Sequence, residues 1–304
     1  MHRSGTSFCV RALQRHGTLL PTNLLPAAND NPEGFLEPAE LVSLNERLLH
    51  SAQALWDASW PIRPTVSSLQ RKQFGTELQN LVEKWCSNTD PNVQSTASNQ
   101  LMALKDPRLC RTLPLLSPYL TPQTFRYGIA VIREPNAVVA SLLERNGDDM
   151  SPLKGFALWM RYNLDMVQGR NTNTEVGEWP IISFEALIKE PLGTFQPILQ
   201  QWQHHGFIIE HQPKQELICR QAKPRPNYLE VLPQQWMELG QTFHSLLQQS
   251  KTLREVPEAV IQAVEQWLES TPELNHELLA HEAQRRAHLG AALAAERLLS
   301  WRNQ

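Results

Sequence analysis

The sequence lacks the features that mark several classes of protein. No apolar run approaches the roughly 18 residues of a membrane-spanning helix, and the first residues do not form an apolar segment with a small-residue cleavage site. The formal net charge of −3 comes from nearly balanced acidic and basic residues, which gives no electrostatic footprint for nucleic acid. We therefore expect a cytoplasmic protein with no transmembrane segment and no nucleic-acid partner.

Cysteine is also scarce, and its spacing is not that of a zinc site. The four cysteines are Cys9, Cys86, Cys110 and Cys219. We expect reduced thiols, with Cys9 packed in a helix as a small apolar side chain. The pair His204-His205 and His211 lack a matching set of ligands, so ordinary surface histidines are expected. The sequence predicts no metal site.

The remaining composition and periodicity predict an α/β fold. Apolar residues make up 41% of the 304 residues, which is ample for a packed core. Short strand patterns at 102–105, 127–132 and 180–184 are separated by longer helical patterns. The predicted helices in this part are 8–20, 41–55, 69–85, 109–116, 136–145, 153–167 and 192–203. Alternating strands and helices favour a parallel sheet that binds ligands at the carboxyl ends of its strands.

The chain divides into two predicted parts. Polar stretches at 21–32, 87–99 and 169–177 are predicted to be surface loops. After the segment Lys223-Pro224-Arg225-Pro226 only helical patterns follow, at 233–249, 257–270 and 272–301. We therefore predict a nucleotide-binding domain over 1–230 and a helical extension over 231–304. The apolar stripe of the last helix either packs on the core or forms a homodimer.

The first candidate site is the turn Arg3-Ser4-Gly5-Thr6-Ser7, which runs into the first predicted helix. Backbone N–H groups converge at a helix start, where the helix dipole adds about half a positive charge. An anion fits there; a glycine turn without a ligand is the alternative. The loop does not match the P-loop motif G-x-x-x-x-G-K-[ST], because it lacks the Lys and the Ser or Thr that follow the second glycine. The usual magnesium ligand of a P-loop kinase is therefore missing.

The second candidate site follows the strand predicted at 127–132. Arg133 ends that strand, and Ser141 lies two turns into the helix that Pro135 opens. A guanidinium matches a phosphate bidentately, although an ion pair with Glu134 is the alternative for Arg133. Two separate phosphate cradles fit a nucleotide that carries charge at both ends of its ribose.

These two motifs together resemble the PAPS-dependent sulfotransferase family. The chain is closest to the bacterial branch whose loop reads Met-His-Arg-Ser-Gly-Thr-Ser. Further segments agree in order, namely 31–37, Leu44-Asn45, Lys105-Asp106-Pro107-Arg108, Leu158-Trp159, Tyr162-Asn163 and 181–185. The resemblance covers roughly the first two-thirds of the chain. It implies a P-loop-like parallel sheet flanked by helices.

The resemblance also implies an activity, which is transfer of a sulfuryl group from 3′-phosphoadenosine 5′-phosphosulfate (PAPS) to a hydroxyl or amine acceptor without a metal. Arg3 then contacts the bridging and sulfonate oxygens, and Ser4, Gly5, Thr6 and Ser7 hold the 5′-phosphate. Arg133 and Ser141 hold the 3′-phosphate. A carbohydrate, a lipid or a small molecule can present the acceptor hydroxyl.

The resemblance suggests Glu37 as the general base, with Glu33 as the alternative. A glutamate at a helix start also acts as a partner of the helix dipole. Lys105 assists the sulfonate, orients the acceptor or forms a structural salt bridge. Trp56 and Trp60 line the acceptor pocket or belong to the core.

The chain departs from the family pattern in two respects. A phosphate loop normally follows a buried strand, yet only two residues precede Arg3, so the first strand is expected to be truncated. Either the given start is too late, or the central strand is absent and the sheet is incomplete. The Arg-Lys-Gly element that some members use on the 3′-phosphate is missing, and Arg220 is a weak substitute. The rival functions are a magnesium-dependent P-loop nucleotide kinase or phosphotransferase, and an inactive nucleotide-binding or interaction protein.

Overall fold

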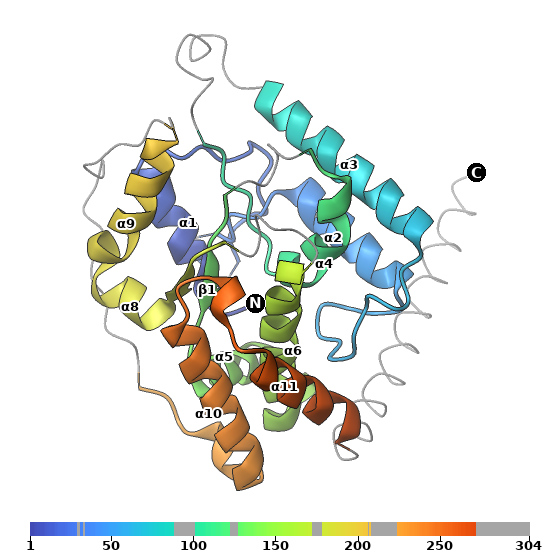
Figure 1. Cartoon of the computed structure of the whole chain (residues 1–304), viewed down its shortest axis with the longest axis vertical. Coiled ribbons are helices and arrows are strands. Elements are labelled where there is room, and N and C mark those ends of the chain that lie inside the picture. The colour runs from blue at the N-terminus through green and yellow to red at the C-terminus, as the bar shows by residue number, and fades with distance from the viewer. Residues whose placement is uncertain are drawn as a thin grey trace.

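A computed structural model describes residues 1–28, 31–32, 34–87, 101–121, 127–171, 178–205, 207 and 224–271. In this part of the chain, helices surround a small parallel sheet of two strands (Figure 1). The elements up to the first strand are α1 (Thr6–Arg15), α2 (Ala39–Ser51), α3 (Ser68–Ser87), α4 (Leu109–Leu116) and β1 (Ala130–Ile132). The next are α5 (Pro135–Asn146), α6 (Pro152–Gln168), β2 (Ile181–Ser183), α8 (Phe184–Lys189) and α9 (Pro191–His204). The last are α10 (Gln234–Gln249) and α11 (Glu258–Ser270).

The two strands form the centre of an α/β arrangement. Ala130 of β1 lies opposite Ile181 of β2, and Ile132 lies opposite Ser183. Side chains alternate along a strand, and Ala130 and Ile132 accordingly join the apolar cluster around α5 and α6. Val131 points the other way, into the cluster that contains residues of α1 and α9. Helices therefore cover both faces of the sheet, as a parallel sheet requires.

The prediction of a strand at 102–105 is wrong, because the structure has a single parallel bridge there, between Leu19 and Met102. Leu19 donates its N–H to Leu101 and accepts from Ala103. Pro21 follows shortly and has no N–H to continue a ladder. The strands expected at 127–132 and 180–184 are present in shorter form, as β1 and β2.

The predicted helices agree with the structure except near a few ends. The first was expected to reach residue 20, but α1 ends at Arg15, and Gly17 follows with a φ of 90°. The helix expected over 41–55 ends at Ser51, and Gln53 has a φ of 55°. Helix α8 was not predicted, because its six residues are too short for a periodic signal. The helix expected at 272–301 lies outside the described residues.

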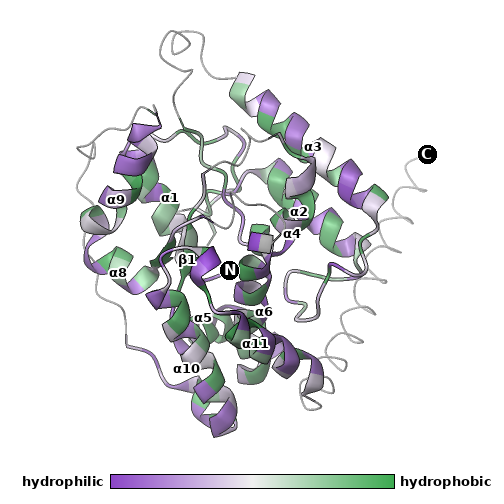
Figure 2. Ribbon diagram, in the orientation of Figure 1, coloured by the Kyte–Doolittle hydropathy of each residue, from purple (hydrophilic) through white to green (hydrophobic). Residues whose placement is uncertain are grey.

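Helix α6 runs through the middle of the molecule and is mostly hydrophobic (Figures 1 and 2). Because it is buried on all sides, its polar side chains need partners. Lys154 pairs with Asp57 at 2.7 Å, with both side chains 3% exposed. The guanidinium of Arg161 donates to the carbonyl of Ser59 at 2.8 Å. These contacts tie α6 to the segment that joins α2 to α3.

The C-terminal helices pack on the same core as α6. Phe243 of α10 meets Trp159 of α6 with ring centroids 5.7 Å apart. Trp267 of α11 meets Phe156 at 5.3 Å. The boundary at residue 230 and a homodimer through these helices stay predictions, and these contacts show that the described helices contribute to one core.

The buried pair of Lys154 and Asp57 yields a stability prediction. Lys154→Met leaves the Asp57 carboxylate buried without its cation, so we expect a loss of about 3–5 kcal/mol in the free energy of unfolding, measured by urea denaturation. The control is Arg47→Met, because Arg47 and Glu77 form an exposed pair. That change is expected to cost no more than about 1 kcal/mol. Equal losses in the two variants would contradict the assignment.

Candidate anion site at the N-terminal loop

The N-terminal loop is a tight turn in left-handed backbone conformations. Arg3 has a φ of 62° and Gly5 a φ of 83°, and α1 begins immediately afterwards. A Cβ atom on Gly5 would lie 2.1 Å from the ring of Phe184, so only glycine fits against that ring. Ser4 between them is buried, at 1% exposure. The backbone of this loop is therefore fixed by contact with the residue that opens α8.

The structure brings the two sequence motifs into contact. The Arg3 side chain donates from Nε to the Ser141 hydroxyl at 2.8 Å. Arg133 donates from Nη1 to the backbone carbonyl of Arg3 at 2.8 Å, across 130 positions of sequence. The Arg133 guanidinium also lies 4.7 Å over the Phe184 ring. One cluster therefore contains the loop, the end of β1, the interior of α5 and the start of α8.

Arg133 lies among charges of both signs. Burial lowers the pKa of Arg133, the neighbouring cations of Arg225 and Arg3 lower it further, and the carboxylates of Glu185 and Glu134 oppose that shift. Glu134 does not pair with Arg133, because its carboxylate accepts from the first N–H groups of α5 instead. The Nε of Arg133 is buried without a hydrogen-bond acceptor in the described part of the chain. An anion would supply the acceptor that this guanidinium lacks.

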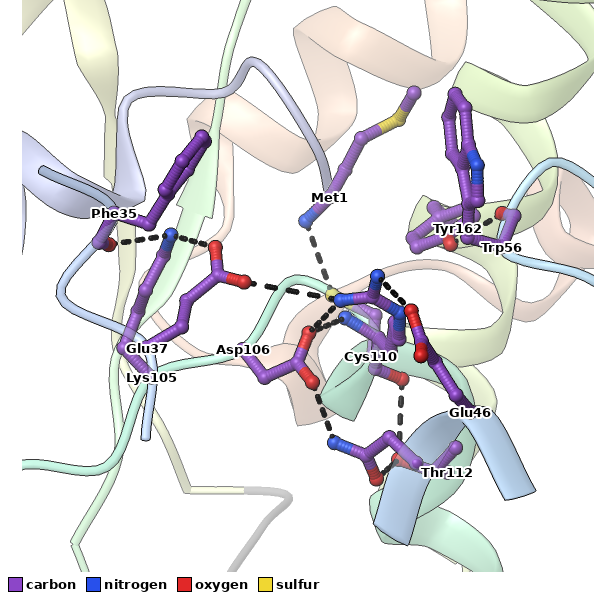
Figure 3. A network of polar contacts seen from close by, with 12 residues as sticks. Met1, Phe35, Glu37, Glu46, Trp56, Lys105, Asp106, Cys110, Thr112 and Tyr162 are labelled. Atoms are coloured by element: carbon purple, nitrogen blue, oxygen red, sulfur yellow. Dashed lines mark hydrogen bonds and ion pairs between the residues drawn. The ribbon is translucent and has the colours of Figure 1, made fainter. Parts of the chain in front are cut away.

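The other end of the loop meets a buried ion pair (Figure 3). Lys105 donates from Nζ to Glu37 at 2.5 Å, to Ser7 Oγ at 3.1 Å and to the carbonyl of Phe35 at 3.1 Å. Glu37 is 5% exposed and Lys105 is 7% exposed. Burial raises the pKa of Glu37, and the attraction of Lys105 opposes that rise. The pKa of Glu37 is therefore higher than that of an exposed glutamate.

A second set of polar contacts holds this ion pair in place. Arg108 lies 3.8 Å from Glu37 and pairs at 2.9 Å with Asp106 and with Glu46. Asp106 also accepts from Asn45 at 2.8 Å. The Arg108 guanidinium thus has carboxylate partners, although its Nε, like that of Arg133, has no hydrogen-bond acceptor in the described part of the chain. The Arg133 guanidinium instead contacts the Arg3 carbonyl and the Phe184 ring.

The predicted site residues therefore gather along one loop. Arg3, Arg133 and Ser141 lie at one end, whereas Ser7, Lys105 and Glu37 lie at the other. Glu33 and Arg220 lie outside the described residues. Trp56 and Trp60 are partly buried and pack on the apolar clusters, and neither lines the large cavity beside Lys105.

Phe184 and Trp159 are contributors to the site to which the sequence analysis gave no role. Trp159 Nε1 donates to the Arg133 carbonyl at 3.0 Å and so fixes the end of β1. Phe184 packs against Gly5 of the loop and lies under the guanidinium of Arg133. Both residues stand in segments that carry the family resemblance, and the position of Phe184 at the carboxyl end of the strand predicted at 180–184 was the available signal.

The remaining polar candidates have ordinary surroundings. Cys9, Cys86 and Cys110 are free thiols, and burial raises the pKa of Cys9 to about 12; Cys219 and His211 lie outside the described residues. Among the residues that the structure describes, no group of three or more His, Cys, Asp or Glu side chains could hold a metal ion. No described helix has the length and apolarity to cross a membrane.

Comparison with known proteins finds no matching family model, no matching curated protein and no matching solved structure. A functional proposal therefore rests on the resemblance of the sequence motifs and on the geometry of the loop and its neighbours.

The glycine of the loop yields a prediction about its backbone. Gly5→Ala combines backbone strain with a collision against Phe184, so we expect a loss of about 3 kcal/mol or more in unfolding free energy. Gly34→Ala is the matched control, because Gly34 has a φ of 84° but no atom within 4 Å of an added Cβ. It should cost about 1 kcal/mol. Thermal or urea unfolding measures both, and indistinguishable losses would contradict a close approach at Gly5.

Proposed function

We propose that this protein transfers a sulfuryl group from PAPS to a hydroxyl or amine acceptor. The observation that carries the proposal is the contact of Arg3 with Ser141 and of Arg133 with the Arg3 carbonyl. The resemblance assigns the 5′-phosphosulfate to the loop and the 3′-phosphate to Arg133 and Ser141. These two assignments require the two motifs to be neighbours, as they are in the structure.

The donors available at this end suit a phosphate. Ser141 Oγ accepts the proton of Arg3 Nε, which leaves the Ser141 hydroxyl proton free to donate to an anion. Arg133 offers its Nε–H, which has no protein acceptor among the described residues. The N–H groups at the start of α1 add the positive end of a helix dipole. Together these groups can bind two anionic oxygen groups on one ligand.

The proposed chemistry makes small demands on the protein. Sulfuryl transfer resembles phosphoryl transfer, with a loose transition state and charge spread over peripheral oxygens. Arg3 would stabilise the charge that develops on the leaving group, and Lys105 would stabilise the sulfonate. Glu37 would accept the acceptor proton, a role that its raised pKa favours. Arg3 belongs to the loop, Lys105 donates to Ser7 of the loop, and Glu37 pairs with Lys105.

A binding protein without transfer activity is the second candidate, and the Lys105–Glu37 pair favours it. The Glu37 carboxylate is already engaged by Lys105 at 2.5 Å, so it has to be released before it can accept a proton. The P-loop kinase alternative has no comparable support, because the loop lacks the residues that hold magnesium. Binding of adenosine 3′,5′-bisphosphate without magnesium distinguishes the sulfotransferase from the kinase. Transfer of labelled sulfate distinguishes the sulfotransferase from the inactive binding protein.

The assignment of the 3′-phosphate predicts a selective loss of affinity. Arg133→Ala should weaken adenosine 3′,5′-bisphosphate by about 10- to 100-fold, since it removes a charge-assisted hydrogen bond. Adenosine 5′-phosphate should lose far less, and isothermal titration calorimetry measures both. The control is Arg254→Ala, which removes an exposed arginine paired with Glu178. Equal losses for both nucleotides would refute the assignment.

The role of Glu37 predicts a loss of rate with little loss of affinity. Glu37→Gln keeps an oxygen for Lys105 but removes the base, so transfer should slow by about 100-fold or more, while adenosine 3′,5′-bisphosphate binds nearly as before. Glu46→Gln is the control, because Glu46 contacts the same network through Arg108 but is half exposed. Unaltered turnover in Glu37→Gln would exclude Glu37 as the base.

A further inference from the structure

The carboxylate of Glu37 lies between two cations. Its Oε1 accepts from Lys105 Nζ at 2.5 Å (Figure 3), and its Oε2 lies 3.8 Å from Arg108 Nη1. The first distance is that of a charge-assisted hydrogen bond, whereas the second is too long for a hydrogen bond. All three side chains are buried, so little water screens their charges. Each oxygen of the carboxylate therefore faces a different cation.

Arg108 is held in place by two other carboxylates. Asp106 Oδ1 accepts from the backbone N–H and from Nη1 of Arg108, both at 2.9 Å, and Glu46 accepts from Nη2 at 2.9 Å. The second oxygen of Asp106 accepts from Asn45 at 2.8 Å, and the Asn45 side-chain carbonyl accepts from the Thr112 hydroxyl at 2.7 Å. The guanidinium is therefore anchored from α2, which contains Asn45 and Glu46, and from α4, which contains Thr112.

Lys105 is held in a different way. One of its acceptors, Ser7 Oγ, belongs to the N-terminal loop, so the ammonium already reaches the place where an anion is proposed to bind. An ammonium on a flexible stem can follow a ligand more easily than a guanidinium that is fixed by its planar fork. An anion at the loop would therefore attract Lys105, while Arg108 stays with Asp106 and Glu46.

Arg108 has donor capacity left for a further carboxylate. Its Nη1 carries two N–H groups, and within the described residues one hydrogen bond is formed there, to Asp106. A movement of about 1 Å by the Glu37 side chain would bring Oε2 within hydrogen-bond distance of this nitrogen. If Lys105 left without such a second partner, a buried carboxylate would stay unpaired, which is strongly unfavourable.

We propose that Arg108 is a positioning residue for Glu37, and that it takes over the carboxylate when a ligand with a sulfonate group draws Lys105 away. The carboxylate then stays ionised and keeps its orientation, so that it can accept the proton of the acceptor hydroxyl. Asn45 and Thr112 support this role, because they fix the Asp106 side chain that holds Arg108. The inference rests on the proposed function, which assigns the sulfonate to Lys105.

The charges around Glu37 give this role a measurable consequence. Among the described residues, the charged groups that act on Glu37 are Lys105, Asp106 and Arg108. Burial raises the pKa of Glu37 and Asp106 adds to that rise, whereas the two cations lower it. With Lys105 engaged elsewhere, Arg108 is the cation that keeps the carboxylate ionised. If Arg108 is removed as well, Glu37 should take up a proton when the sulfonate binds.

The test measures proton uptake when PAPS binds. Isothermal titration calorimetry at neutral pH, in buffers of different ionisation enthalpy, gives the number of protons that the complex takes up. The unaltered chain is compared with Arg108→Gln and with the double variant Arg108→Gln, Glu37→Gln. Adenosine 3′,5′-bisphosphate is the control ligand, because it lacks the sulfonate. Protons that belong to the ligand cancel when two proteins are compared with the same ligand.

With PAPS, Arg108→Gln should take up about half a proton or more beyond the unaltered chain. The double variant should lose this excess, and the bisphosphate should show none. If Arg108→Gln does not fold, Thr112→Val takes its place, because it removes the hydroxyl that holds Asn45 but keeps the side-chain shape. It should give a smaller excess, which Glu37→Gln again removes.

Two results would overturn the inference, and they differ in what else they affect. If PAPS binds and proton uptake is the same in the unaltered chain and in the folded variant, Arg108 does not take over Glu37, and the proposed function stands. If neither nucleotide binds to the unaltered chain, the proposed function fails and this inference fails with it.

Discussion

The site depends on the hydrogen bond from Arg133 to the carbonyl of Arg3. The Arg3 carbonyl lies at the end of β1 in a turn whose backbone is left-handed at Arg3 and at Gly5. Arginine is strained at such a φ, and strain of this kind persists where the surroundings hold it. Here the Arg3 side chain is anchored on Ser141, and the Phe184 ring packs on Gly5. The loop geometry is thus a tertiary property as well as a local one.

The two ends of the loop differ in how their charges are compensated. Around Arg133 the cations of Arg225 and Arg3 are only partly offset by Glu185 and Glu134, because the net shift of the Arg133 pKa is downward, and its Nε has no protein acceptor in the described region. Around Lys105 each charge has a partner of opposite sign at short range. An anion would therefore relieve repulsion at the first end, while at the second it would have to compete with a carboxylate. The first end is therefore suited to binding a phosphate. At the second end, a bound anion would displace the carboxylate from Lys105.

The sequence was sufficient for most helices, because their apolar periodicity extends over several turns. It was insufficient for residues 102–105, where an apolar run of strand length has Leu19 as its one bridge partner among the described residues. The sequence placed Arg133 and Ser141 close together, at the end of a strand and in the helix that follows it. It could not show that Arg3 contacts Ser141, because that contact depends on how α1 packs on the sheet. Similarly, a salt bridge was one interpretation of Lys105, but its partner Glu37 lies 68 positions away. Long-range pairing of this kind leaves no periodic signal.

The Lys105 ammonium links the two proposed steps of the reaction. An ammonium has three protons to donate, and those of Lys105 point to Ser7, to the Phe35 carbonyl and to Glu37. An anion that binds Lys105 must therefore replace one of these acceptors. Replacing Glu37 would free a buried carboxylate whose pKa is already raised by burial, and such a carboxylate takes up a proton readily. Arrival of the donor and release of the base would then be a single exchange at Lys105, which reconciles an engaged carboxylate with a catalytic role.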